Sequence, residues 1–398
     1  MLEESQAAAG LRPGQQGYRA VLTALAIGGF ITFSNFHFTQ PLLPVLSEYW
    51  QISPVLVSLS VSLTIFTMSA CLLFYGSLSD RTGRKNLIVW TSMLAALPTL
   101  FAAAAPTFPW LLAARTLQGV FLAGLPAVAM AYVGEEVDTP FVGMVMGLYI
   151  SGTSIGGMGG RIISGVINDW IGWRAAFLVI GCTTLLGALL MGALLPPSRR
   201  FQRSSYSPLH GIRQHLSSVQ LWPAFAVGCF WMFAFVGLFN YVGFYLGNEP
   251  FHLSPGQVGL LYLTYLSGTI TAPLTGHSID RFGFTGTVSW TTLLALAGVL
   301  LTGIHSLFVI IVGLLLFAVG FFMSHVSASG FVSQMAVENK AAATALYLTF
   351  YYLGGSVGST ALGVLWTNYH WIGVEFGVAA SLLMVIWSSR FMRKRSHE

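Results

Sequence analysis

The sequence predicts an all-α membrane protein with twelve transmembrane helices in two pseudo-symmetric six-helix bundles. Three observations support this fold class. Only 8% of the 398 residues are charged, 55% are hydrophobic and the mean hydropathy is +0.73, whereas soluble chains are about one quarter charged. Apolar stretches of about 20 residues, long enough to cross a bilayer as a helix, recur along the chain. Finally, the polar turn at 76–85 returns 200 residues later at 276–283.

Twelve apolar stretches mark the expected spans. In chain order they cover residues 20–46, 54–78, 87–105, 109–134, 141–167, 174–195, 220–247, 255–278, 287–304, 307–335, 341–366 and 371–390. A Pro-, Arg- and Ser-rich stretch separates the sixth from the seventh. We therefore expect an N-terminal tail at 1–19, an N-terminal bundle at 20–195, a linker at 196–219, a C-terminal bundle at 220–390 and a C-terminal tail at 391–398.

The two halves repeat more than the polar turn. A Ser-Pro pair opens the second span at 53–54 and the eighth span at 254–255, and Trp173 and Trp371 open the sixth and the twelfth. Parallel repeats of this kind place a substrate path between the halves, near the middle of the membrane.

Basic residues gather on one side of the predicted membrane. When the N-terminus is placed in the cytoplasm, nearly all of the 18 Lys and Arg residues fall in cytoplasmic loops, and only Arg174 falls on the opposite side. This positive-inside bias predicts a multi-pass protein of the bacterial cytoplasmic (inner) membrane with both termini in the cytoplasm. It also explains the net charge of +5 without a nucleic-acid partner.

The sequence carries no pattern typical of an enzyme. Cys71, Cys182 and Cys229 lie inside apolar stretches, at spacings that suit neither a metal site nor a disulfide framework. No phosphate-binding loop, metal-ligand cluster or nucleophile arrangement is visible. We therefore expect no enzymatic activity, no cofactor and no bound metal. No removable signal peptide is visible, so we expect the first helix to act as the insertion signal.

Several segments resemble the signatures of the major facilitator superfamily, over nearly the whole chain. The turn with Asp80, Arg81, Gly83, Arg84 and Lys85 matches the best-known signature, between helices 2 and 3. Two further matches are 115–119 in helix 4 (Arg-Thr-Leu-Gln-Gly) and 172–174 after helix 5 (Gly-Trp-Arg). The resemblance implies the fold of that superfamily and secondary transport by alternating access. We expect a monomer.

Helix 5 contains the glycine-rich stretch 152–161, which resembles the signature of drug/proton antiporters and most closely their acriflavine-sensitivity branch. It departs from that pattern because Gly157 replaces the usual proline and Arg161 follows the glycines. Small residues allow another helix to approach closely, and the resemblance implies helix 8 of the other half as the partner. The expected packing residues are Gly152, Gly156, Gly157 and Gly160.

The turn at 76–85 has two interpretations. Asp80 can cap a neighbouring helix and pair with an arginine, while Gly83 permits a tight turn. Such a cluster would hold the halves together on the cytoplasmic side when the transporter faces outward. The alternative is a topology anchor with a helix stop. We favour the latch because the second half repeats the Asp-Arg pair. Its expected members are Gly76, Asp80, Arg81, Gly83, Arg84, Lys85, Asp280 and Arg281.

Arg115 and Arg161 lie inside spans at similar depths. An arginine in a membrane usually faces a cavity or a partner, and snorkelling toward the headgroups is the alternative. The helix 4 resemblance implies proton coupling for Arg115, while Arg161 is a candidate for substrate binding. We expect no acidic residue in the interior of any span, so His37 and His325 are the best remaining candidates for proton coupling. Neutral, hydrogen-bonded histidines are the alternative.

Helices 1 and 7 present matching faces. Phe33, His37 and Gln40 follow the spacing i, i+4, i+7, and the pattern returns at 233, 237 and 240. A few polar groups among aromatic rings suit a small-molecule cavity, with core packing or lipid contact as the alternative. The expected substrate-binding residues are Phe33, Asn35, Phe36, His37, Gln40, Arg161, Phe233, Asn240, Tyr347 and Tyr351.

These features predict proton-coupled export of small, partly apolar compounds such as drugs, dyes or metabolites. One alternative is uptake or exchange of a small organic anion, because the two buried arginines have no buried acid beside them. A membrane sensor that transports nothing is a third hypothesis, which a large soluble domain or a long tail would favour. The expected partners are a small-molecule substrate, protons and the lipid bilayer, and no nucleic acid.

Overall fold

The computed structural model describes residues 10–198, 200, 208–336 and 338–392. Most of the predicted tails and part of the predicted linker therefore lie outside the described residues. Within the described part, ten helical runs are long and apolar enough to cross a membrane. Two of them, Pro255–Thr302 and Lys340–Ser389, are interrupted at Gly283 and at His370, where the backbone leaves the helical region. Each of these two runs holds two spans, so the prediction of twelve transmembrane helices is confirmed.

The first half consists of helices 1 to 6. Helix 1 comprises α2 (Gln16–His37), η1 (Gln40–Leu42) and α3 (Leu43–Trp50), helices 2 and 3 are α4 (Pro54–Thr82) and α5 (Arg84–Ala103), helix 4 comprises α6 (Phe108–Leu122) and α7 (Gly124–Glu136), and helices 5 and 6 are α8 (Thr139–Ile171) and α9 (Trp173–Leu194).

The second half follows α10 (Pro208–Leu216), which lies in the linker. Helix 7 is α11 (Trp222–Gly247), and helix 8 comprises α12 (Pro255–Leu261), η2 (Tyr262–Thr264), α13 (Tyr265–Thr271), η3 (Ala272–Leu274) and the start of α14 (Thr275–Thr302). Helix 9 is the part of α14 after Gly283, helix 10 is α15 (Leu307–Met335), and α16 (Lys340–Ser389) supplies helices 11 and 12 on either side of His370.

The repeated Ser-Pro pairs start helices 2 and 8 by the same local chemistry. The Ser53 hydroxyl accepts a hydrogen bond from the backbone N–H of Leu56, and the Ser254 hydroxyl accepts one from Gln257 in a reciprocal capping box. The proline that follows each serine needs no donor, because the first N–H groups of a helix have no partner within the helix. The repeat in the sequence is thus a repeated helix start.

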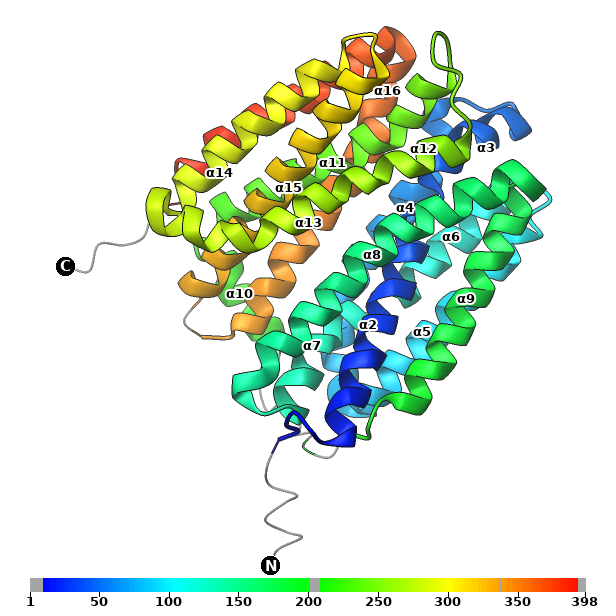
Figure 1. Cartoon of the computed structure of the whole chain (residues 1–398). Coiled ribbons are helices and arrows are strands. Elements are labelled where there is room, and N and C mark those ends of the chain that lie inside the picture. The colour runs from blue at the N-terminus through cyan, green and yellow to red at the C-terminus, as the bar shows by residue number, and fades with distance from the viewer. Residues whose placement is uncertain (1–9, 199, 201–207, 337, 393–398) are drawn as a thin grey trace, which may run out of the picture.

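Close packing of helix 1 on helix 5 explains the glycine-rich stretch (Figure 1). Gly152, Gly156 and Gly160 face the backbone of α2 at residues 26, 30 and 34, where an added Cβ atom would collide. This corrects the expectation that these glycines approach helix 8. Gly157 faces the Arg161 side chain of its own helix, and a later glycine, Gly165, meets helix 8.

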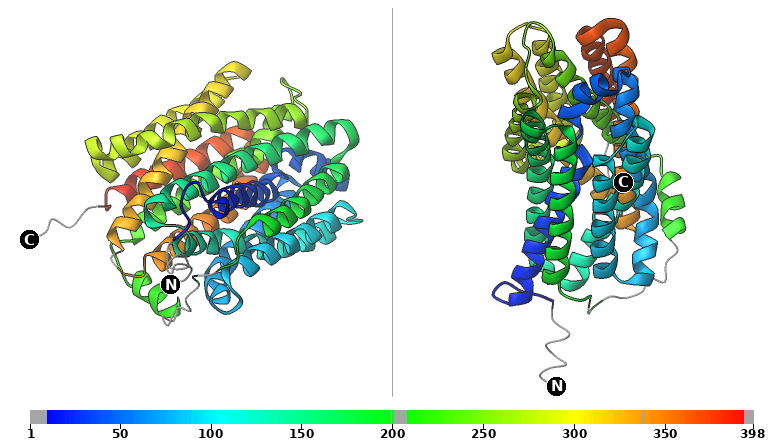
Figure 2. Two further views of the ribbon diagram at one scale, coloured as in Figure 1. Left: turned by 60° about the horizontal axis from the view of Figure 1, so that its bottom comes forward. Right: turned by 90° about the vertical axis from the view of Figure 1, so that its right-hand side faces the viewer.

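The second half repeats this packing between α11 and α16. Gly354 and Gly358 of helix 11 face the backbone of helix 7 at residues 229 and 233. Two further views show the helices of both halves running along a common direction (Figure 2). The first and fifth helices of each half therefore form one rigid pair, and the two pairs face each other across the centre.

The halves are joined at one end of the molecule. We call the end with the turn at 76–85 the basic end, and the end near Trp173 the far end. Helix 2 packs on helix 11 and helix 5 on helix 8. Between α4 and α16, Ser359 donates to the Ser58 carbonyl (3.2 Å) and Ser69 donates to the Thr349 carbonyl (2.8 Å). Such bonds between the described residues of the two halves run from the far end to about the middle of α4, so this conformation is closed at the far end.

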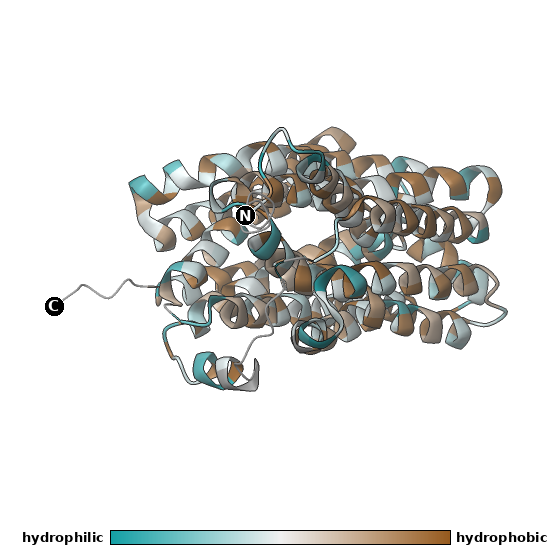
Figure 3. Ribbon diagram, turned by 90° about the horizontal axis from the view of Figure 1, so that it is seen from below, coloured by the Kyte–Doolittle hydropathy of each residue, from teal (hydrophilic) through white to brown (hydrophobic). Residues whose placement is uncertain are grey.

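The outside of the bundle is apolar. Figure 3 shows hydrophobic residues along the flanks of the helices, while hydrophilic residues gather mainly at helix ends and in loops. Large apolar side chains are exposed on both halves, among them Phe74, Trp90, Trp170, Phe308 and Phe376. A soluble protein would bury such residues, whereas a bilayer solvates them and leaves the backbone bonds to be satisfied within the helices.

Candidate functional site

The site forms where helix 1 is interrupted. Pro41 and Pro44 have no N–H to donate, so α2 ends at His37 and the chain continues as the short η1 segment. The backbone around the break finds partners on neighbouring helices. Ser164 of helix 5 donates to the Phe38 carbonyl (2.7 Å). The interruption brings Gln40 to the boundary between the halves.

One chain of side-chain hydrogen bonds crosses this boundary. Arg161 Nε donates to Gln40 Oε1 (2.6 Å), Gln40 Nε2 donates to Asn240 Oδ1 (2.7 Å), and Asn240 Nδ2 donates to Ser359 Oγ (2.6 Å). All three bonds run in the same direction, away from the cation, and linked bonds of this kind polarise one another. We call Arg161, Gln40, Asn240 and Ser359 the central chain.

The central chain follows the internal repeat. Gln40 and Asn240 are 200 residues apart and meet directly. Arg161 of helix 5 bonds to Gln40 in the first half, as Ser359 of helix 11 bonds to Asn240 in the second. The two pairs occupy corresponding places, but only the first half contributes a charge. The site is therefore symmetric in shape and asymmetric in electrostatics.

The guanidinium of Arg161 is buried, with 1% of the residue exposed. Nη1 donates to the Gly157 carbonyl (2.7 Å), and the guanidinium carbon lies 4.4 Å and 5.0 Å from the ring centroids of Tyr262 and Tyr265. In the described part of the chain Arg161 has no carboxylate partner, and Nη2 makes no hydrogen bond. The cation is stabilised by amide and carbonyl dipoles and by two tyrosine side chains.

Aromatic rings continue from Arg161 around the centre. Each ring contacts the next, with centroid separations from 3.8 to 6.1 Å. We call this set the aromatic arc; in order it comprises Tyr265, Phe235, Phe321, His325, Tyr351, Tyr352, Phe36 and His37. The arc starts beside Arg161 and ends three residues before Gln40. The aromatic arc and the central chain therefore lie next to each other, and both contain residues of the two halves.

Most of the predicted binding residues lie in the central chain or in the aromatic arc, and the others lie beside or outside them. Gln40, Arg161 and Asn240 form the central chain, and Phe36, His37 and Tyr351 belong to the aromatic arc. Tyr347 is joined to the arc by its hydroxyl, 2.9 Å from His325 Nδ1. Phe33 lies beside Phe36, whereas Phe233 makes no ring contact among the described residues.

The structure corrects the expectation that Asn35 binds the substrate. Its carbonyl oxygen accepts hydrogen bonds from Thr99 (3.0 Å) and Gln118 (2.6 Å), and its amide donates to Thr184 and to the Ile31 carbonyl. These partners lie in the interior of the first half. Because its carbonyl and its amide are both engaged there, Asn35 is a framework residue and does not face the region between the halves.

Arg115 also serves the framework. It is fully buried, and its five N–H groups meet the carbonyls of Asn35, Phe36 and Ser60 and the side chains of Gln118 and Thr39. A guanidinium has five N–H donors and no acceptor, so none remains for a ligand. Arg115 thereby ties helix 4 to helix 2 and to the broken end of helix 1. Its implied role in proton coupling stays a prediction.

The expectation that no acidic residue lies inside a span is wrong at Glu375. This residue lies near the start of helix 12, and its carboxylate accepts a hydrogen bond from Thr302 (3.1 Å). It sits at the far end of the second half, away from the central chain. Among the described residues no group of three His, Cys, Asp or Glu side chains is placed to hold a metal ion.

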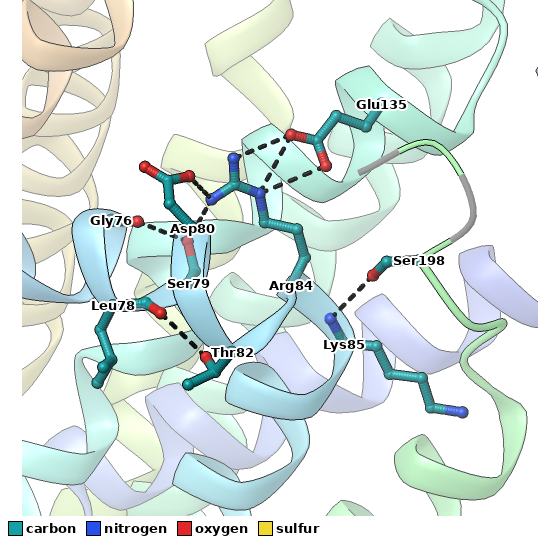
Figure 4. Close-up of polar contacts among 9 residues, drawn as sticks. All are labelled: Gly76, Leu78, Ser79, Asp80, Thr82, Arg84, Lys85, Glu135 and Ser198. Carbon is teal, nitrogen blue, oxygen red and sulfur yellow. Dashed lines mark hydrogen bonds and ion pairs between the residues drawn. The ribbon is translucent and has the colours of Figure 1, made fainter. Parts of the chain in front are cut away.

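The polar turn forms an ion-paired cluster in the first half (Figure 4). Arg84 lies between Asp80 (2.6 Å) and Glu135 of helix 4 (2.9 Å) and also donates to Ser79. Gly83, at φ 87°, separates α4 from α5, and Gly283, at φ 69°, breaks α14 at the equivalent place. In the described part of the chain Asp280 and Arg281 form no ion pair. The latch remains a prediction for the opposite conformation.

Replacing Asp80 by asparagine should slow transport while the protein still inserts and folds. Arg84 keeps its bonds to Glu135, so the first half retains its cluster, whereas a charge available to the other half is lost. Transport rate and membrane abundance should be measured together. Asp280→Asn removes the equivalent charge of the second half and should slow transport as well, whereas Glu249→Gln, an exposed acid at the far end, is the control. A wild-type rate for Asp80→Asn would remove the latch, and failure to insert would favour the topology anchor.

Asp169 is a functional candidate that sequence reasoning missed. It lies at the far end of helix 5, and its Oδ2 accepts hydrogen bonds from the Ser254 hydroxyl (2.6 Å) and the Gly256 N–H (3.0 Å) of the other half. A carboxylate from one half thus caps helix 8 of the other, where the helix dipole favours negative charge. The spacing of Asp169 matched no motif, so only the fold reveals this partner.

Asp169→Ala should weaken the closure of the far end. With spin labels at Glu48, exposed on α3, and at Ile304, exposed in the loop after α14, the distance distribution should gain a longer component. Glu249→Ala is the control, because this exposed acid has no ion-pair partner among the described residues. Unchanged distances in Asp169→Ala would show that the cap does not hold the halves together.

Comparisons with known proteins agree with this architecture. The sequence profile described as "Major Facilitator Superfamily" matches residues 25–359 and 246–397. The chain is 40% identical over 390 residues to the inner membrane transport protein YnfM of Escherichia coli, covering 97% of this chain and 94% of that protein. It is 35% identical over 387 residues to YybF of Bacillus subtilis, described as an uncharacterized MFS-type transporter, covering 96% of each.

Two solved structures share the fold at low sequence identity. A bacterial homologue of the human lysosomal transporter Spinster, inward-facing and unoccupied, superposes with a TM-score of 0.78 at 15% identity and covers 96% of this chain and 97% of that one. The nucleoside transporter NupG superposes with a TM-score of 0.76 at 14% identity and covers 94% and 99%.

Proposed function

We propose, from the premise that this chain belongs to the Major Facilitator Superfamily, that it exports small, partly apolar compounds in exchange for protons. The observation that carries this proposal is the central chain, in which polar side chains of both halves meet beside a continuous arc of aromatic rings. A few polar groups in an aromatic setting fix the orientation of a small molecule and leave its apolar body to the rings.

Alternating access gives the central chain two states. In this conformation the far end is closed, and the Gln40–Asn240 bond is part of the closure. When the far end opens, helices 1 and 7 separate and this bond breaks, because the partners belong to different halves. The side chains that lie together in the conformation open at the basic end then move apart, which favours release of the exported compound at the far end. Closure of the far end and formation of the binding site therefore use the same groups.

Proton coupling is assigned to histidine. His325 lies in the aromatic arc next to the Tyr347 hydroxyl, and His37 lies in the arc with Nδ1 unbonded. Either imidazole can gain or lose a proton as its surroundings change between conformations. The same proposal includes three further points. The protein is a drug/proton antiporter, it lies in the inner membrane, and both of its termini are in the cytoplasm.

The test is a flux assay with purified protein in liposomes under an imposed pH gradient. The panel contains cationic dyes, neutral aromatic compounds and organic anions. We expect at least one compound to move across the membrane in the direction opposite to proton flow. Collapse of the pH gradient by an ionophore should stop this movement. Flux that ignores the gradient would favour uptake or exchange over proton-coupled export. Absence of flux for every compound would contradict the proposal.

A further inference from the structure

The central region is electrically unbalanced. Arg161 brings a positive charge there, while the acidic residues of the described chain lie in loops or near helix ends, as Glu375 does at the far end. Burying an arginine in a membrane is unfavourable, and such residues normally face a partner or an aqueous cavity. Arg115, which like Arg161 is fully buried, has every donor engaged by the framework. Arg161, in contrast, has a donor without an acceptor. The unbalanced positive charge of the central region is therefore that of Arg161.

Three polar atoms in this region have no partner. They are Arg161 Nη2, the Tyr265 hydroxyl and His37 Nδ1, all of them buried. Tyr265 and Arg161 are neighbours, since the guanidinium carbon lies 5.0 Å from the centroid of the Tyr265 ring. Buried polar groups nearly always have a hydrogen-bond partner, and exceptions call for an explanation. An acceptor supplied from outside the chain would satisfy the two donors beside each other.

The neighbouring surface defines the rest of the ligand. Tyr262 and Tyr265 cover the guanidinium, and the aromatic arc continues from Tyr265 through Phe235 to Phe321. These rings offer contact area and few hydrogen bonds. A polyhydroxylated compound would find too few partners here, and a cation would be repelled by Arg161. An anionic group attached to an apolar body meets both parts of the surface.

We propose that the transported compounds are organic monoanions, with a carboxylate bound by Arg161 Nη2 and the Tyr265 hydroxyl and an apolar body against the aromatic arc. This inference rests on the proposed transport function and specifies the charge of the substrate. The carboxylate oxygens accept from both donors, and they also compete with Gln40 for the guanidinium. Binding at Arg161 therefore weakens the link through Gln40 to Asn240 and couples occupancy to separation of the halves.

The experiment compares acids with their amides, which differ in charge and little in shape. Binding to the purified full-length protein is measured by intrinsic fluorescence and thermal shift for benzoate and benzamide, indole-3-acetate and its amide, and octanoate and its amide. We expect at least one acid to bind about tenfold more tightly than its amide, the size of effect that a hydrogen bond to a charged group provides. If no acid binds more tightly than its amide, the proposal is overturned.

Substitutions locate the effect. Arg161→Gln should reduce the affinity for the acid to about that for its amide, and Arg161→Lys should restore only part of the preference for the acid because a lysine lacks the planar fork. Tyr265→Phe removes only the hydroxyl and should weaken acid binding severalfold. Tyr262→Phe is the matched control, because its hydroxyl already donates to the Phe239 carbonyl (3.1 Å). An equal loss in both tyrosine variants would overturn the assignment of Tyr265.

The binding and flux results separate the two proposals. Acid binding that depends on Arg161, without any movement under a pH gradient, would support the anion site and contradict proton-coupled export. Gradient-driven movement of cationic dyes, without acid binding, would support export and overturn the anion site.

Discussion

Replacing Arg115 by alanine should remove most of the folded protein from the membrane. The side chain supplies donors to the carbonyls of Asn35 (3.0 Å) and Ser60 (3.0 Å), on helices 1 and 2. A hydrogen bond to a charged group contributes about 1.5–3 kcal/mol, so the loss of these two bonds should lower the free energy of unfolding by about 3 kcal/mol or more. A protein with typical marginal stability would lose a large part of its margin.

The measurement is the yield of monodisperse protein after detergent extraction, together with its melting temperature. Arg115→Lys should recover a fraction, because an ammonium group has three donors where the guanidinium has five. Arg174→Ala is the control. This arginine lies at the far end and bonds the Ala103 carbonyl and the Tyr49 hydroxyl near the surface, so its loss should be mild. Normal yield and normal melting for Arg115→Ala would contradict the framework role.

Gln40→Leu should reduce transport by at least about tenfold, more than Asn240→Leu does. Gln40 holds two links of the central chain, one to Arg161 and one to Asn240. Its loss leaves a buried cation without one of its acceptors, which is costly. Asn240→Leu leaves the Arg161–Gln40 bond in place. The second variant should therefore remain well folded and change mainly which compounds are carried.

The double variant tests whether the two amides act together. Residues in direct contact give non-additive effects, and distant residues give additive ones. Gln40→Leu combined with Asn240→Leu should lower the transport rate by clearly less than the product of the two single effects. A control pair, Asn240→Leu with Asp80→Asn at the basic end, should be additive. Additive effects for Gln40 and Asn240 would show that the bond between them has no part in transport.

The internal repeat explains why the fold was predictable and why Gln40 and Asn240 could be selected together from the sequence. Equal spacing in the two halves requires equivalent helices, and residues at equivalent positions beside the symmetry axis meet each other, as Gln40 and Asn240 do. Apolar length adds the number of spans, and the charge asymmetry predicts their orientation. These signals are global, so they survive local irregularities such as the break in helix 1.

The rest depended on details that periodicity does not carry. The orientation of Asn35 follows from the packing of helix 1 against helices 3, 4 and 6. A face of glycines indicates that a helix comes close, but not which helix, and Gly156 meets helix 1. The cap from Asp169 joins residues 85 and 87 positions apart across the two halves. In each case the sequence allows several packing partners, and only the tertiary structure determines which one is used.

A reversible cross-link across the halves tests alternating access at the central chain most directly. Ser62 of helix 2 and Thr360 of helix 11 lie with their hydroxyl oxygens 2.6 Å apart, on the side closed in this conformation. After Cys71, Cys182 and Cys229 are replaced by alanine, cysteines are placed at 62 and 360. Flux of a compound identified in the liposome panel is then measured before oxidation, after oxidation and after reduction. We expect oxidation to stop the flux and reduction to restore it, because the far end must open in every cycle. Full flux through the oxidised protein would contradict the claim that the halves separate there.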